Sequence, residues 1–211
     1  MIKEVEQLLE RHPELSVCKE SITDMIETIS ASFERGGTLF TCGNGGSASD
    51  AEHICGEFLK GFLMLRPLSL DDRTRFEELF DDEGVSVGKK LQNGLRAVSL
   101  LSHPSYSSAF ANDVDAELVF GQQLWVLGQK NDVLLAISTG GCATNVKKAL
   151  MVAKVKEMKS ILLTGNRGGC CEAYADCVVP VPYSETYRIQ ELHLPIYHTL
   201  CMAIESRFFG K

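Results

Sequence analysis

No stretch of this 211-residue sequence approaches the roughly 18–20 consecutive apolar residues that are needed to span a bilayer. The opening segment MIKEVEQLLERHPELS is charged throughout, so it also lacks the apolar run of a secretory signal peptide. Hydrophobic residues make up 45% and charged residues 23% of the chain, which are ordinary values and exclude a disordered or fibrous protein. The length suits one α/β domain with a sizeable core. We therefore expect a single soluble domain over 1–211, with no membrane as partner.

The sequence also lacks an excess of positive charge. Lys and Arg total 21 against 28 Asp and Glu, which gives a formal net charge of −7 and a pI of about 5.3. Without a basic run, the chain is a poor candidate for binding nucleic acid through phosphate contacts. A small anionic ligand is not excluded, because a local loop at a helix N-terminus attracts anions even in an acidic protein.

None of the eight cysteines belongs to a C-x-x-C pair. Most lie inside apolar segments such as VCKESI, FTCGNG and HTLCMAI, and the chain shows no signal peptide. We therefore expect reduced, buried thiols rather than a disulfide framework. Cys170-Cys171 is the exception, because adjacent cysteines in a loop can be redox-labile.

Strand and helix patterns alternate along most of the chain. Short apolar runs predict five strands, over 38–42, 95–101, 132–138, 160–165 and 177–182. Helical spacing of apolar residues predicts an N-terminal helix over about 17–35 and further helices over about 47–62, 114–127, 143–157 and 185–208. This alternation is typical of an α/β fold with a doubly wound parallel sheet covered on both faces. Ligands of such sheets bind beyond the carboxyl ends of the strands, usually at a topological switch point.

Residues 63–94 interrupt the alternation as an insertion that is strongly acidic in its middle. Arg73, Phe76, Leu79 and Phe80 have the spacing of a short helix between turns. Two interpretations stay open. The insertion is either a solvated surface excursion, or a lid or oligomer contact near a site.

Two glycine-rich loops follow predicted strands and precede predicted helices. In GNGGS (43–47), glycines let backbone N–H groups approach a ligand where a helix N-terminus favours an anion. Asn44 and Ser47 add hydrogen-bonding side chains, although Ser47 also suits the N-cap of the helix. STGG (138–141) repeats the arrangement, and two such loops at neighbouring strand ends can converge on one phosphate or sugar hydroxyl. Neither loop has the Walker pattern or the G-x-G-x-x-G dinucleotide pattern.

Titratable and amide side chains stand at helical spacing in two places. His53 and Glu57 are four residues apart and share one face of the helix predicted after GNGGS. Gln190 and His198 are eight apart and point in roughly the same direction from the last helix, with His193 on a flank. Two imidazoles, a carboxylate and an amide oxygen suit a borderline metal ion. The alternatives are an acid/base pair without metal, or an ordinary contact on the helix surface.

Four stretches carry a resemblance to a known family: CGNGGSASDAEHICGEF, ANDVDAELVFGQQLWVLGQKNDVLLAIST, TGNRGG and ETYRIQELHLPIYH. Together they resemble the bacterial sedoheptulose-7-phosphate isomerases (phosphoheptose isomerases), members of the sugar isomerase (SIS) domain superfamily. The similarity covers about 18–208 without 63–94. Its specific part is the combination of G-N-G-G-S…H-x-x-x-E with R-I-Q-E-x-H-x-x-x-x-H.

The resemblance implies a fold and an activity. The fold would be a SIS-type, flavodoxin-like three-layer sandwich around a five-stranded parallel sheet. The activity would be the interconversion of sedoheptulose 7-phosphate and D-glycero-D-manno-heptose 7-phosphate, an aldose–ketose isomerisation through an enediol. This reaction begins the route to the heptose of bacterial cell-surface glycans such as lipopolysaccharide. Family members are typically cytoplasmic homotetramers with active sites between subunits, and many bind zinc.

The functional residues of the family map onto this sequence by motif. The metal ligands correspond to His53, Glu57, Gln190 and His198. The substrate contacts correspond to Asn44, Gly45, Gly46, Asn112, Asp113, Ser138 and Thr139, and we add Ser47, Glu57 and Gln190 as predicted substrate contacts. Glu57 is the predicted general base and His198 its acid/base partner. A zinc ion, one per site, would polarise the carbonyl and stabilise the enediolate.

Three positions depart from the pattern of the family. Gly140 and Ala143 stand where its phosphate loop usually has hydroxyl-bearing residues, and Gly61, next to Lys60, stands where an Arg is expected. We therefore expect weaker phosphate binding or a different phosphosugar, such as another ketose phosphate. Two alternatives from other classes are a non-catalytic SIS adaptor, like the relatives that bind replication initiator proteins, and a phosphosugar-sensing module.

Overall fold

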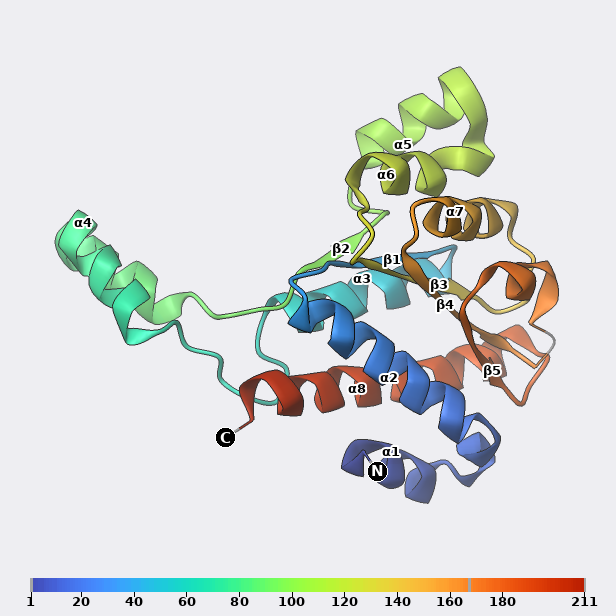
Figure 1. Cartoon of the computed structure of the whole chain (residues 1–211), viewed down its shortest axis with the longest axis horizontal. Helices are drawn as coiled ribbons and strands as arrows, with labels where there is room; N and C mark the ends of the chain where they lie inside the picture. The colour runs from blue at the N-terminus through green and yellow to red at the C-terminus, as the bar shows by residue number, and fades with distance from the viewer. Residues whose placement is uncertain (1, 167, 211) are drawn as a thin grey trace.

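A five-stranded parallel sheet lies between two layers of helices in the computed structural model, which describes residues 2–166 and 168–210 (Figure 1). The strands are β1 (Leu39–Gly43), β2 (Ala97–Ser99), β3 (Val133–Ser138), β4 (Lys159–Gly165) and β5 (Cys177–Val181). Their order in the sheet is β2-β1-β3-β4-β5. The predicted α/β class and the doubly wound parallel sheet are confirmed.

The central strands are mostly apolar and almost entirely buried because both faces of the sheet are covered. All six residues of β3 are buried. Leu135 and Ile137 pack into the hydrophobic cluster on one face, whereas Leu134 and Ala136 pack into the cluster on the other. The alternation follows from the period of two along a strand, and it explains why the sequence reads as an unbroken apolar run.

Four helices cover one face of the sheet and three cover the other (Figure 1). The first layer contains α1 (Lys3–Arg11), α2 (Lys19–Glu34), α3 (Gly46–Leu59) and α8 (Thr186–Phe209). The second layer contains α5 (Pro104–Phe110), α6 (Val119–Leu127) and α7 (Thr144–Val155). The helices predicted over 17–35, 47–62, 143–157 and 185–208 correspond to α2, α3, α7 and α8.

Two helical segments differ from the sequence prediction. At the N-terminus, α1 buries Val5 and Leu8 and packs beside α8, and a 3-10 turn (Pro13–Cys18) leads into α2. The helix predicted over 114–127 is wrong in its first part, since a π-helical turn (Ala111–Asp115) and a 3-10 turn (Ala116–Leu118) precede α6. The Asp115 carboxylate accepts a hydrogen bond from the amide of Glu117 at 2.8 Å. This local bond competes with the helical pattern and delays the start of α6.

The insertion 63–94 forms a projecting arm whose helix α4 (Leu70–Lys90) is longer than the predicted short helix (Figure 1). The helix is kinked at Asp81, which has a positive φ of 49°. The second half of α4 folds against the first so closely that a Cβ on Gly84 would lie 1.9 Å from the Phe76 carbonyl oxygen. In the described part of the chain, neither α4 nor any other helix is long and apolar enough to cross a membrane.

Candidate active site

The GNGGS loop leaves β1 and turns directly into α3. Gly45 has a positive φ of 57° and forms the N-cap of α3. A Cβ on Gly43 would lie 2.6 Å from the Ser47 carbonyl oxygen, so the backbone passes too close to α3 for a side chain there. The prediction that Ser47 caps the helix is wrong, because Ser47 lies inside the first turn of α3 and is 3% exposed.

The STGG loop lies beside GNGGS because β1 and β3 are neighbours in the sheet. Gly43 is in register with Ile137, the residue before Ser138. The next strand after β1 in the sequence lies on its other side, as β2. The space between the two loops is therefore the topological switch point, where open α/β sheets bind ligands.

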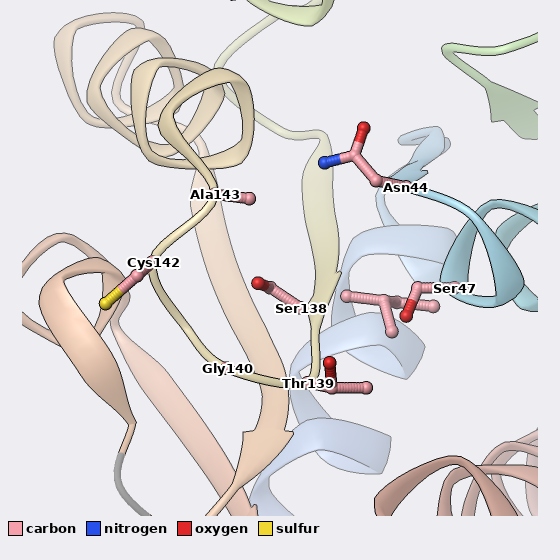
Figure 2. A pocket seen from close by; sticks show the side chains of 8 residues that line it. Asn44, Ser47, Ser138, Thr139, Gly140, Cys142 and Ala143 are labelled. Atoms are coloured by element: carbon pink, nitrogen blue, oxygen red, sulfur yellow. The ribbon is translucent and has the colours of Figure 1, made fainter. Parts of the chain in front are cut away.

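A cavity of about 270 Å³ opens between these loops (Figure 2). It is lined by Asn44, Ser47, Ile137, Ser138, Thr139, Gly140, Cys142 and Ala143. The Asn44 amide is held by two reciprocal hydrogen bonds with the side chain of Asn145, at 2.9 and 3.0 Å. The structure thus brings together four of the predicted substrate contacts: Asn44, Ser47, Ser138 and Thr139.

Backbone amides beside this cavity are available as hydrogen-bond donors. Among the described residues, the amides of Gly140, Cys142 and Ala143 donate to no protein acceptor. They stand just before α7, whose N-terminus carries the partial positive charge of the helix dipole. Among residues 2–166 and 168–210, no Lys or Arg lines the cavity. The described groups there that suit a phosphate are hydroxyls, backbone amides and the helix dipole.

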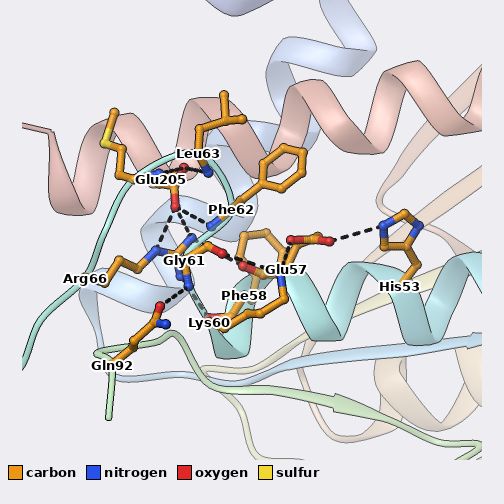
Figure 3. A network of polar contacts seen from close by, with 11 residues as sticks. His53, Glu57, Phe58, Lys60, Gly61, Phe62, Leu63, Arg66, Gln92 and Glu205 are labelled. Atoms are coloured by element: carbon orange, nitrogen blue, oxygen red, sulfur yellow. Dashed lines mark hydrogen bonds and ion pairs between the residues drawn. The ribbon is translucent and has the colours of Figure 1, made fainter. Parts of the chain in front are cut away.

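Ionisable side chains follow one another in the second half of α3 and at Lys60, the residue that directly follows the helix (Figure 3). The Nε2 atom of His53 lies 3.2 Å from Oε1 of Glu57, and Nζ of Lys60 lies 2.9 Å from Oε2 of the same carboxylate. Glu57 is only 8% exposed, whereas the Lys60 side chain is mostly exposed. Lys60, next to Gly61, therefore places a positive charge beside this carboxylate.

Helix α8 brings His198 to this group. The rings of His53 and His198 have their centroids 5.2 Å apart. Burial lowers the pKa of His198, and the neighbouring His53 lowers it further. Nε2 of His198 is buried and has no hydrogen-bond partner among the described residues. A neutral imidazole with a free nitrogen is suited to exchange a proton with a bound molecule.

Gln190, also on α8, reaches the GNGGS loop. A Cβ on Gly46 would lie 2.3 Å from Nε2 of Gln190. Gly46 is therefore a contact point that lets the side chain from α8 approach the start of α3.

Two functional candidates were missed in the sequence. The Tyr197 hydroxyl donates to Oδ1 of Asp50 at 3.2 Å and lies 3.1 Å from Nδ1 of His53. This contact fixes the orientation of the His53 ring. Asp50 could have been found, since Asp50, His53 and Glu57 follow one another at helical spacing of three and four. Tyr197 carries no such signal.

Three other residues lie apart from the cavity and from this group. Asn112 and Asp113 occupy the π-helical turn before α6, where their exposed side chains bond to each other at 2.8 Å. They are not among the residues that line the cavity. His193 is fully buried, and its Nε2 lies 3.4 Å from the carbonyl oxygen of Thr164 on β4. His193 is thus a core residue.

The donor types of the predicted metal ligands fit zinc, and the orphaned Nε2 of His198 is one available donor. Both ring nitrogens of His53, however, already contact Tyr197 and Glu57. Within 2–166 and 168–210, no group of three or more His, Cys, Asp or Glu side chains is arranged to hold a metal ion. The side chains as they lie do not assemble a metal site, and zinc stays a prediction.

A buried ion pair supports the end of α3. The Nη2 atom of Arg66 lies 2.7 Å from Oε1 of Glu205, and both side chains are almost fully buried (Figure 3). Glu205 also accepts hydrogen bonds from the amides of Phe62 and Leu63, and Arg66 donates to the carbonyl oxygen of Phe58. These bonds tie the last turn of α3 and the root of the arm to α8.

Comparison with known proteins identifies the family. Residues 2–84 match the family model of the SIS domain. The phosphoheptose isomerase of Burkholderia pseudomallei (strain 1710b) is 38% identical over 86% of this chain and 79% of its own length. That of Helicobacter pylori (strain ATCC 700392 / 26695) is 39% identical over 92% of this chain and 85% of its own. The chain belongs to the phosphoheptose isomerase family.

Solved structures of phosphoheptose isomerases agree in fold. The structure from Neisseria gonorrhoeae has a TM-score of 0.71 and 29% identity, covering 95% of this chain and 98% of that one. The structure from Francisella tularensis has a TM-score of 0.74 and 26% identity, covering 95% and 94%. The resemblance drawn from the sequence motifs is confirmed, and this member of the phosphoheptose isomerase family is an isomerase.

Proposed function

We propose that the chain interconverts sedoheptulose 7-phosphate and D-glycero-D-manno-heptose 7-phosphate. The course of α3 carries this proposal. Ser47 lines the cavity at the start of the helix, and Glu57 lies ten residues, nearly three helical turns, further along. His53 stands between them. A long, extended phosphosugar would reach from the cavity towards this group, which favours a heptose phosphate over a triose phosphate.

The phosphate of the substrate would bind in the cavity. Ser138 and Thr139 offer hydroxyls, and the unbonded amides before α7 offer N–H donors. Asn44 is already held in place by Asn145 and can bond a sugar hydroxyl without further ordering. Rigid donors of this kind lose little conformational entropy on binding.

The reaction moves a proton between C1 and C2 of the open-chain sugar. Glu57 removes the proton from C1 of the ketose to give the enediol and returns it to C2 of the aldose. His198 moves the accompanying proton between the two oxygens, because its Nε2 is free and its lowered pKa keeps the ring neutral. Lys60 contacts Oε2 of Glu57 and His53 contacts Oε1, so both oxygens of the base are held in position.

An NMR assay with sedoheptulose 7-phosphate tests the proposal, with shorter ketose phosphates as a comparison. We expect a new aldose signal with the heptulose phosphate and slower turnover with the shorter sugars. Faster conversion of a shorter ketose phosphate would assign the chain to another substrate. Binding without conversion of any sugar would favour a phosphosugar sensor.

We also propose that zinc binds at His53, Glu57, Gln190 and His198, on the strength of their donor types. Zinc there would polarise the carbonyl of the sugar. Elemental analysis of protein purified without chelator or His-tag tests this. We expect about one zinc per chain, falling in His53→Ala and unchanged in His12→Ala, and the absence of zinc in the wild-type protein would refute it.

A homotetramer with active sites between subunits is a further proposal, as are a cytoplasmic location and a role in heptose biosynthesis for lipopolysaccharide. The arm supports self-association, because Leu70, Leu79 and Phe80 are exposed on it. Light scattering tests the oligomer. A monomer at micromolar concentration would refute it.

A further inference from the structure

Two cysteines far apart in sequence meet beside the phosphate cavity. The amide of Cys170 donates a hydrogen bond to Sγ of Cys142 at 3.2 Å. Both residues are exposed. Cys142 lines the cavity through its backbone, whereas its sulfur points away from Ser138 and Thr139 (Figure 2). The pair therefore joins the phosphate loop to the segment after β4 without occupying the cavity.

The two segments are packed together through glycine. A Cβ on Gly141 would lie 1.9 Å from the carbonyl oxygen of Gly168, and the amide of Cys171 donates to the Gly141 carbonyl oxygen at 2.8 Å. Residues 168–171 thus form the support against which 140–143 rests. A change in this support changes the position of the free amides at Cys142 and Ala143.

The surroundings of Cys142 favour the thiolate form of its side chain. Hydrogen bonds from the amide and the thiol of Cys170 lower the pKa of Cys142, and the nearby Lys147 lowers it further. The start of α7, two residues later, also favours a thiolate. A stabilised, exposed thiolate beside a second exposed thiol is the arrangement of redox-sensitive cysteines.

Cys171 does not take part, which corrects the expectation drawn from the adjacent pair Cys170-Cys171. Cys171 is fully buried and its thiol faces the carbonyl oxygen of Ala143 at 3.8 Å. Burial raises the pKa of Cys171 to about 12, and the neighbouring Cys170 and Cys142 raise it further. Its thiol is therefore inert at neutral pH.

We propose that Cys142 and Cys170 form a reversible disulfide that weakens anion binding in the cavity. Hydrogen peroxide oxidises the Cys142 thiolate to a sulfenic acid, and the second peroxide oxygen leaves as hydroxide, which takes up a proton to give water. The Cys170 thiol then attacks the sulfenic sulfur, a second water leaves, and the S–S bond forms. The bond ties Cys142 to Cys170 and so shifts the backbone amides of Cys142 and Ala143 from their positions beside the cavity. A dithiol reductant restores both thiols. Only the effect on the sugar phosphate rests on the proposed function.

Peptide mapping under non-reducing conditions tests the bond. We expect mild peroxide to consume two of the eight thiols, to join the peptides that contain Cys142 and Cys170, and to be reversed by dithiothreitol. Cys170→Ser should prevent the cross-link, whereas Cys171→Ala should retain it. A bond between Cys170 and Cys171, or loss of only buried thiols, would overturn the proposal.

Binding of inorganic phosphate, followed by calorimetry, tests the consequence without turnover. We expect the oxidised protein to bind phosphate several-fold more weakly than the reduced protein, and Cys170→Ser to be insensitive to peroxide. Equal affinity in both states would overturn the proposed effect. If the reduced protein binds no phosphate, the proposal that this cavity binds phosphate is wrong. Peptide mapping alone then decides whether the disulfide forms.

Discussion

The two ends of the site are built from different groups. At the phosphate end, the donors in the described part of the chain are mostly backbone amides and hydroxyls, and none of the described lining residues is charged. At the other end, His53, Glu57 and Lys60 form a row of ionisable side chains on α3 and directly after it, and His198 joins it from α8. The first end depends on the path of the backbone, and the second depends on individual side chains. Substitutions should therefore act very differently at the two ends.

The largest effect is expected for Glu57→Gln at the ionisable end. The amide cannot accept the proton, so kcat should fall about 10²–10⁴-fold. The measurement is turnover of sedoheptulose 7-phosphate by NMR. The matched control is Glu52→Gln, an exposed carboxylate on the same helix, which should keep normal turnover. Near-normal turnover by Glu57→Gln would remove Glu57 from the role of base.

The buried ion pair below that end should give the next largest effect, on stability. Glu205→Gln leaves the Arg66 guanidinium without its counter-charge inside the protein. Removing one partner of a buried pair costs about 3–5 kcal/mol in the free energy of unfolding. Urea unfolding measures the loss. Glu157→Gln removes a partner of the exposed pair with Lys130, and it should leave the free energy of unfolding almost unchanged, because solvent screens exposed pairs. Similar losses in both variants would show that burial of Glu205 does not matter.

His193 lies on the same helix as His198 but belongs to the core and to neither end of the site. It therefore allows the effect of burial on a histidine to be tested apart from the site. Burial lowers the pKa of His193 to about 4, from an ordinary value of 6.5. The unfolded chain therefore binds the proton more readily, and stability falls as the pH drops from 6.5 towards 4. The free energy of unfolding should fall by about 2 kcal/mol between about pH 6.5 and pH 4.5.

Urea unfolding at several pH values measures this dependence. The free energy of unfolding should depend less steeply on pH in His193→Leu than in the wild-type protein. The dependence should be unchanged in His12→Asn, which replaces a histidine at the end of α1. An unchanged slope in His193→Leu would assign the pH dependence to other groups.

Much of the fold could be predicted from sequence because its signals are local. The apolar run 132–138 predicts β3 regardless of what packs on it, and the helical spacing that starts at Ile22 predicts α2. The interruption of the helix before α6 was not predicted. It depends on a single hydrogen bond from the Glu117 amide to the Asp115 side chain, which the helical spacing of apolar residues does not reveal. The length of α4 was missed for a similar reason, since its close pairing at Gly84 depends on a kink at Asp81.

The site was predictable where it depends on strand ends and was missed where it depends on contacts between elements. Asn44 comes directly after β1 and Ser138 is the last residue of β3, so the sheet places them together. The bond from Tyr197 to Asp50 joins residues 147 positions apart, and the bond from Cys170 to Cys142 joins residues 28 apart. No local sequence pattern predicts such pairs. They follow only from how helices and loops pack on the finished sheet.

The smallest effect is expected at the phosphate end, as a gain. A Cβ on Gly140 would meet open space, and this glycine has no positive φ, so Gly140→Ser fits without strain. The new hydroxyl should add one hydrogen bond to the phosphate, about 0.5–1.5 kcal/mol, and lower KM about 2–10-fold with kcat unchanged. Gly140→Ala is the matched control, because it adds the same Cβ without a hydroxyl and should leave KM as it was. An equal fall in KM with alanine would trace the gain to a stiffer loop, whereas no fall with serine would place the phosphate away from Gly140.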